Sequence, residues 1–143
     1  MPELPEVETL RRALLPLVVN KTCTGLSFYR EDIRFPIPQD TLQEHFSQQV
    51  VHEIQRLGKY LLLKVPHGAM LLHLGMSGRV TLNNSMAIQE KHTHAIFQFG
   101  AKTCLHFVDP RRFGCILWVP QNGEHPLLDK MGPDPFSPEA NAQ

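Results

Sequence analysis

The first residues of the chain, MPELPEVET, bring together the residue types that covalent catalysis at a chain terminus would need. Removal of Met1, which a small second residue permits, would leave Pro2 with a secondary amine. An α-amino group has a pKa of about 8, so an unprotonated fraction could attack an aldehyde-like carbon and form an iminium. Glu3 adjoins this amine and could move its protons, and Glu6 could face the same site. Helix capping also explains the acidic residues, and residue types alone favour it.

A lysine stands at the entrance of an apolar run, Lys59 in GKYLLLKV. In that place a lysine could reach a phosphate or donate a proton. A lysine at a strand entrance is ordinarily solvated, and composition alone favours that simpler role.

Two loops offer side chains suited to nucleic acid. In HLGMSGR (73–79), Met76 stands at the tip of a glycine-rich loop, where it could wedge between stacked bases or fold back onto the core. In VDPRRFG (108–114), Arg111 and Arg112 could contact a phosphate or a base edge, and Phe113 could stack. The alternative for this loop is a solvated hairpin in which Asp109 pairs with one arginine.

A pair of histidines, His92 and His94, occurs in EKHTHAIF. The two lie on the same face if a strand already runs there. Such a spacing could bind a metal, but no third ligand is evident, so solvated or phosphate-contacting histidines are favoured.

Two helices are expected among the elements that position these residues. A helix should begin at Pro5, with apolar residues at helical spacing and Glu8 paired with Arg12, and Pro16 should end or bend it. Asp40 and Gln43 predict a capping box for a short helix in TLQEHFSQ.

The rest of the pattern is β. Short runs rich in β-branched and aromatic residues are separated by turn signals at near-regular spacing, which favours a β-sandwich or barrel. The runs LLLKV and AMLLHL are almost continuously apolar, so we expect both of their faces to be covered. Residues 1–120 therefore form the predicted domain, and the proline-rich residues 121–143 form a linker.

Composition sets the broad class. With 143 residues, 42% hydrophobic and 20% charged, the chain is long enough for one domain with a sizeable core. No apolar run approaches the ~18 residues of a membrane span, and the acidic start does not resemble a signal peptide, so we expect a cytoplasmic protein. Cys23, Cys104 and Cys115 form no CxxC pair, which excludes a zinc ribbon and predicts three buried thiols.

The charge is distributed unevenly. Residues 1–120 carry 13 Lys and Arg against 10 Asp and Glu, whereas residues 121–143 carry one Lys against four acidic residues. A mildly basic body is permissive for a nucleic-acid partner without demonstrating one.

Taken in order, MPELPEVET, GKYLLL, HLGMSG, KHTH and DPRRFG closely resemble the formamidopyrimidine-DNA glycosylase family of bifunctional base-excision repair enzymes, and GPDPFSPE resembles the stretch that joins the family's two domains. The resemblance implies a two-layered β-sandwich flanked by helices, with the first helix carrying the catalytic proline. It implies that Pro2 attacks C1′ of the damaged nucleotide, that Glu3 moves protons, that Lys59 belongs to the β-elimination step, and that Glu6 supports the site.

The resemblance also implies a DNA-binding set. Met76, Arg111 and Phe113 match the residues that fill the gap left by the displaced base and read its partner, typically cytosine. The further matching positions are His73, His92 and Arg112. The loops favour the branch acting on oxidised purines (8-oxoguanine and formamidopyrimidines) over the endonuclease VIII branch, which acts on oxidised pyrimidines.

The length departs from the family pattern, because family members are roughly twice as long. Their second half holds a helix–two-turn–helix unit and a zinc finger, so we expect no cofactor in this chain and weak or no activity without that half. We expect a monomer that binds damaged double-stranded DNA and no membrane, in a bacterial-type cytoplasm at the nucleoid. The competing hypotheses are a non-catalytic DNA-binding remnant and a small β-sandwich binding module.

Overall fold

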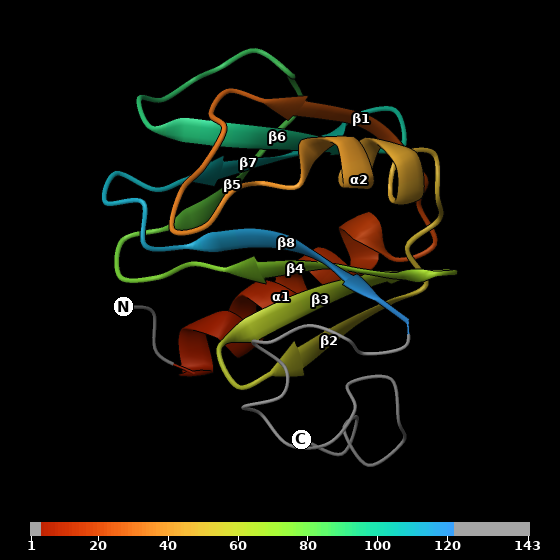
Figure 1. The fold of residues 1–143 in the computed structure, drawn as a ribbon. Coiled ribbons are helices and arrows are strands. Elements are labelled where there is room, and N and C mark those ends of the chain that lie inside the picture. The colour runs from red at the N-terminus through yellow and green to blue at the C-terminus, as the bar shows by residue number, and fades with distance from the viewer. Residues whose placement is uncertain (1–3, 122–143) are drawn as a thin grey trace.

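The computed structural model of the chain describes residues 4–121 and shows a β-sandwich with two helices (Figure 1). The helices are α1 (Leu4–Val18) and α2 (Gln39–His45). The strands are β1 (Cys23–Phe28), β2 (Glu53–Leu57), β3 (Tyr60–Val65), β4 (Gly68–His73), β5 (Arg79–Asn83), β6 (Thr93–Phe99), β7 (Thr103–Val108) and β8 (Cys115–Pro120). They form two antiparallel sheets in the orders β1-β6-β7-β5 and β2-β3-β4-β8. The predicted mostly-β sandwich with an N-terminal helix is confirmed.

The main apolar core joins both sheets and both helices. From α1 it takes Val7, Leu14 and Val18, which are all buried and which lie on one helix face because of their spacing. This face packs on β2 and β3. Leu42 of α2 and the following Phe46 complete the cluster. Full burial of one such side chain contributes about 1.5–3 kcal/mol, so the core holds α1 firmly against the second sheet.

The central strands β3 and β4 are covered on both faces, as their continuous apolar runs predict. Every residue of β4 is buried, and so is every residue of β3 after Tyr60. Leu61 and Leu63 belong to the main core, whereas Leu62 and Leu71 belong to a second apolar cluster on the opposite face.

The helix ends differ from the predicted ones. α1 begins at Leu4 rather than Pro5, and it continues past Pro16 to Val18. Pro16 lies in the last turn of the helix, and Val18 beyond it is buried in the core.

The predicted capping box of α2 is wrong. No side chain caps this helix, which follows Pro38, and Asp40 lies inside its first turn. The amide of Gln43 instead donates to the carbonyl oxygen of Leu26 at 3.2 Å. The side chain of Gln43, which the local pattern assigned to the helix cap, therefore bonds to a strand residue of β1 instead.

All three cysteines are buried free thiols, as predicted. Burial raises the pKa of Cys23 to about 12 and that of Cys115 to about 11. Thiols of this kind are protonated and unreactive at neutral pH. No helix within residues 4–121 is long and apolar enough to cross a membrane.

Candidate functional site

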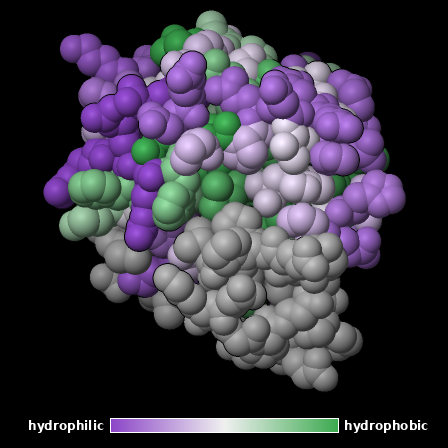
Figure 2. Space-filling view, in the orientation of Figure 1, coloured by the Kyte–Doolittle hydropathy of each residue, from purple (hydrophilic) through white to green (hydrophobic). Residues whose placement is uncertain are grey.

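Four segments lie at the same end of the sandwich: the start of α1, the β2–β3 turn, the loop after β4 and the loop before β8 (Figure 1). The strand register requires this for three of them, since Tyr60 pairs with His73 and His73 pairs with Cys115. In Figure 2 this end, on the left, is mostly hydrophilic with small hydrophobic patches among the polar side chains. Pro2 and Glu3, the predicted nucleophile and acid/base, lie outside the described residues, so their assignment stays a prediction.

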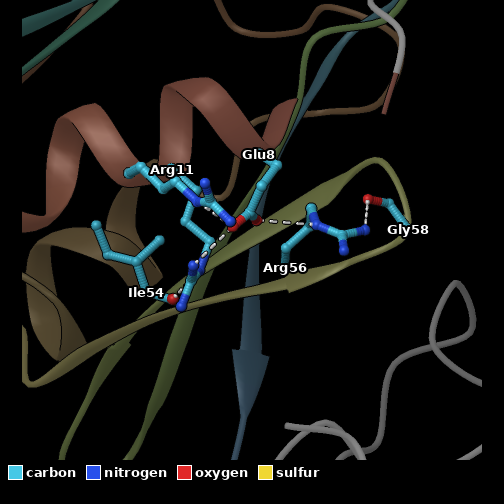
Figure 3. Close-up of polar contacts among 6 residues, drawn as sticks. Glu8, Arg11, Ile54, Arg56 and Gly58 are labelled. Atoms are coloured by element: carbon cyan, nitrogen blue, oxygen red, sulfur yellow. Dashed lines mark hydrogen bonds and ion pairs between the residues drawn. The ribbon is translucent and has the colours of Figure 1, made fainter. Parts of the chain in front are cut away.

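A cluster of ion pairs fixes the first half of α1 against this end (Figure 3). The carboxylate of Glu8 accepts hydrogen bonds from Arg11 at 3.1 Å, Arg12 at 2.9 Å and Arg56 at 3.1 Å. Burial alone would raise the pKa of Glu8, but the hydrogen bonds from Arg12 and Arg56 outweigh it and lower the pKa. The predicted pairing of Glu8 with Arg12 is confirmed.

Arg56 links this ion-pair cluster to the β2–β3 turn. A second guanidinium nitrogen, Nη1, donates to the carbonyl oxygen of Gly58 at 3.2 Å, directly before Lys59. Arg11 adds a hydrogen bond to the carbonyl oxygen of Ile54 at 2.8 Å. The helix is thereby tied to the turn that carries Lys59, which is partly buried, while Glu6 is exposed at the start of α1.

The loop after β4 presents Met76 to solvent. Met76 is 50% exposed, so it does not fold back onto the core. Gly75 precedes it with φ of 64°, and its N–H donates to Nδ1 of His73 at 3.0 Å. Burial lowers the pKa of His73, and the positive charges of Arg34 and Lys59 lower it further. His73 is therefore a buried neutral residue that shapes the Met76 loop.

The loop before β8 is fastened to the Met76 loop through a buried carboxylate. Asp109 is fully buried; its Oδ1 accepts from the hydroxyl of Ser77 at 2.9 Å and its Oδ2 accepts from the N–H of Gly114 at 2.8 Å. The Ser77 oxygen in turn accepts from the N–H of Arg111 at 3.2 Å. Asp109 therefore binds uncharged donors, and the alternative in which it pairs with an arginine is wrong.

The predicted meeting of Met76, Arg111 and Phe113 at one edge of the sandwich is confirmed by these hydrogen bonds between their loops. Phe113 is 43% exposed, and the guanidinium carbon of Arg111 lies 5.2 Å from the centre of its ring. An exposed methionine, a cation and an aromatic ring thus lie together where a partner molecule could reach all three.

The two histidines do not share a face, because β6 begins only at Thr93. His94 is buried, with Nε2 2.7 Å from the carbonyl oxygen of Asp109. His92 is exposed in the preceding turn, with φ of 64°. Within residues 4–121 no group of three or more His, Cys, Asp or Glu lies close enough to hold a metal ion.

One residue that lies at this end, Arg34, is not singled out by the sequence pattern. Arg34 lies in the segment between β1 and α2, and with Arg111, Arg112, Phe113 and Ile33 it lines an open cavity of about 550 Å³. The sequence offers only an arginine between two apolar residues, and nothing local indicates that this segment packs beside the loop before β8.

The sequence is similar to that of a known protein family. The family profile described as "Formamidopyrimidine-DNA glycosylase N-terminal domain" matches residues 1–116. The formamidopyrimidine-DNA glycosylases of Magnetococcus marinus and Psychromonas ingrahamii are each 41% identical to this chain, over 100% of it and 53% of the relative. The chain thus spans about half the length of the relatives it matches.

Solved structures show the same likeness. The formamidopyrimidine-DNA glycosylase of Lactococcus lactis, bound to DNA containing an AP site, matches with a TM-score of 0.79 and 28% identity, over 90% of this chain and 49% of that one. A structure of MutM in complex with DNA containing carbocyclic 8-oxo-G also matches with a TM-score of 0.79, at 27% identity, over 90% of this chain and 48% of that one.

Proposed function

Since the chain belongs to the formamidopyrimidine-DNA glycosylase family, matching its N-terminal domain, we propose that it is the catalytic part of a base-excision DNA repair enzyme. The enzyme is a DNA glycosylase and AP lyase that removes oxidised purines such as 8-oxoguanine and formamidopyrimidines from double-stranded DNA. The names of the relatives support this choice, and one structural relative holds DNA with an 8-oxoguanine analogue.

The covalent chemistry starts at Pro2. Its amine attacks C1′ of the damaged nucleotide, and the glycosidic bond breaks with its electron pair leaving on the base, which takes up a proton. The C1′–O4′ bond of the sugar ring then opens, O4′ takes up a proton, and the nitrogen lone pair forms the C1′=N iminium. This iminium makes the C2′ hydrogen acidic, so loss of that proton expels the 3′ phosphate and cleaves the strand. Water then releases the sugar from Pro2. Glu3 moves protons at the sugar, Lys59 acts in the elimination step and Glu6 supports the site.

The observation that carries the proposal is the meeting of Met76, Arg111 and Phe113 at one edge of the sandwich. Excision requires the damaged base to leave the stack, at a cost of a few kcal/mol. An exposed apolar side chain can fill the vacated space, while the guanidinium of Arg111 donates to the acceptor edge of the unpaired base opposite. The exposed residues His92 and Arg112 complete the proposed DNA contacts, and buried His73 supports the set by holding the Met76 loop through the N–H of Gly75.

The remaining parts of the enzyme follow the family pattern. Residues 1–120 form the catalytic domain, and residues 121–143 lead toward a second half that would hold the zinc site and much of the DNA grip. Residues 122–143 lie outside the described residues. The proposed enzyme is a cytoplasmic monomer that acts on the nucleoid.

Borohydride trapping tests the proposal. The 143-residue chain is incubated at low salt with duplex DNA carrying a preformed AP site, so that no base need be excised, and the iminium is reduced. We expect a covalent adduct in which the DNA is attached to Pro2, and a marked loss of adduct with Pro2→Gly, which keeps a terminal amine but not the secondary amine of proline. An adduct that maps to Lys59 would show that the nucleophile is wrongly assigned. Specific binding to this DNA without any adduct would favour the non-catalytic alternative.

A further inference from the structure

The cavity lined by Ile33, Arg34, Arg111, Arg112 and Phe113 joins two parts of the chain that are far apart in sequence. The N–H of Arg34 donates to the carbonyl oxygen of Gly114 at 3.3 Å, which fastens the segment before α2 to the start of β8. The cavity is therefore built by tertiary contact, and Arg34 is the one basic residue that the first third of the chain supplies to it.

The cavity walls carry an excess of positive charge. Arg34, Arg111 and Arg112 are all exposed, and none of the ion pairs found within residues 4–121 includes any of them. Asp109 is the nearest carboxylate along the chain. It is buried, and its two oxygens accept hydrogen bonds from Ser77 and Gly114. Three guanidinium groups without a carboxylate partner favour an anionic ligand.

The three arginines are not equivalent. The guanidinium of Arg111 lies over the ring of Phe113, and that of Arg34 lies 5.4 Å from the centre of the Phe35 ring. Arg112 has φ of 58°, a left-handed conformation that a non-glycine residue adopts only at some cost in energy. Stacking leaves the guanidinium edges of Arg34 and Arg111 available as hydrogen-bond donors, and an edge of this kind matches the oxygens of a phosphate.

We propose that this cavity binds a backbone phosphate of the DNA beside the Met76 and Arg111 side chains, and that Arg34 is a phosphate-binding residue of the interface. This inference rests on the proposed function, because it takes DNA as the source of the phosphate. The apolar walls, Ile33 and Phe113, suit the sugar or base next to that phosphate.

Salt-dependent DNA binding tests the role of Arg34. The affinity of the 143-residue chain for a labelled duplex with an abasic-site analogue is measured by fluorescence anisotropy over a series of salt concentrations. Each phosphate contact contributes about 0.9 to the slope of log affinity against log salt. We expect Arg34→Ala to weaken binding at low salt and to reduce this slope by about 0.9. We expect Arg34→Lys, which keeps the charge, to retain most of the slope.

A matched control is available at the other end of the same molecule. Lys102 is exposed in the β6–β7 turn, at the opposite end of β7 from Asp109. Lys102→Ala removes the same charge and should leave the slope unchanged. Equal melting temperatures for the wild type and both alanine variants would show that each remains folded, which is expected since both side chains are exposed.

The outcomes separate this inference from the proposed function. If the wild-type chain binds the duplex and Arg34→Ala has the wild-type slope, the phosphate site is wrong while the proposed function stands. If inorganic phosphate displaces the duplex as effectively as unlabelled DNA does, the cavity is a site for free anions and the inference is also wrong. If the wild-type chain does not bind the duplex even at low salt, the inference fails, whereas the proposed function is judged by the borohydride adduct.

Discussion

The hydroxyl of Ser77 donates to the buried carboxylate of Asp109 at 2.9 Å, and this hydrogen bond joins the loop that carries Met76 to the loop that carries Arg111 and Phe113. The two residues are 32 positions apart. Because the same Ser77 oxygen accepts from the N–H of Arg111, a shift of either loop would break contacts in the other. The exposed methionine and the exposed arginine are thus held in a fixed relation before any DNA binds.

Ser77→Ala removes the donor and leaves one oxygen of buried Asp109 without this partner. We expect the free energy of unfolding to fall by about 1–3 kcal/mol, as measured by urea denaturation. Hydrogen exchange of the Arg111 amide should become faster. The control is Ser85→Ala, since the hydroxyl of Ser85 accepts only from the N–H of Ala87, in an exposed position. Similar losses in the two variants would contradict the assigned role of Ser77.

Gly75→Ala should force the two loops apart. A Cβ at Gly75 would lie 2.6 Å from the carbonyl carbon of Phe113, and φ is +64°. Gly58 has nearly the same φ, +60°, but a Cβ there would meet nothing within 4 Å. We therefore expect Gly58→Ala to cost about 1–2 kcal/mol for backbone strain alone, and Gly75→Ala to cost about 1–3 kcal/mol more for overlap. Denaturation curves of equal midpoint would show that the close approach is unimportant.

Glu8→Gln should loosen α1 from the β2–β3 turn. The variant loses the charge that Arg11, Arg12 and Arg56 share, and we expect a loss of about 1–3 kcal/mol at neutral pH. Because the folded pKa of Glu8 is lowered, its stabilising effect is present above the ordinary pKa and is lost as the pH falls through the folded value. The difference between wild type and variant should therefore shrink in acid.

Urea denaturation at pH 7 and at about pH 3 measures this difference, with Glu44→Gln as the control. Glu44 is 75% exposed and contacts only His45, at 3.8 Å, so its replacement should change stability little at either pH. A Glu8→Gln deficit that stays constant with pH would contradict the ionic role of Glu8.

His73 should make the protein less stable in mild acid. Its folded pKa lies below the ordinary value of about 6.5 because of burial and nearby Arg34 and Lys59. As the pH falls through 6.5, the unfolded chain takes up a proton that the folded chain does not, so stability decreases until the folded pKa is reached. Protonation at Nδ1 would also break the hydrogen bond from Gly75.

The free energy of unfolding measured between pH 7.5 and about 5 checks this expectation. His73→Asn keeps a hydrogen-bond acceptor near the Nδ1 position but does not titrate, so its pH dependence over this range should be flatter than that of the wild type. An NMR titration that places the pKa of His73 above 6.5 would reverse the sign of the predicted effect.

Local pattern alone determined the sequence of elements and the chemical character of the loops. Helical spacing predicted one apolar face with Val7, Leu10, Leu14 and Leu17, of which Val7 and Leu14 are buried and the other two are partly buried against the core. The continuous apolar runs marked β3 and β4 as covered on both sides. Glycines and prolines marked the loops that carry Met76 and Arg111. These features depend on residues close together in the chain, and backbone geometry makes such short-range periodicity readable.

Only the tertiary structure decided which loops lie together and which groups the polar side chains hydrogen-bond. Arg56 reaches Glu8 from 48 positions away, Arg34 reaches the start of β8 from a different segment, and Asp109 binds Ser77 instead of a neighbouring arginine. Gln43 likewise bonds to Leu26 in place of the expected cap. A buried polar group must find a partner within hydrogen-bond distance, and strand register, set by packing across the whole core, determines which partners come within that distance.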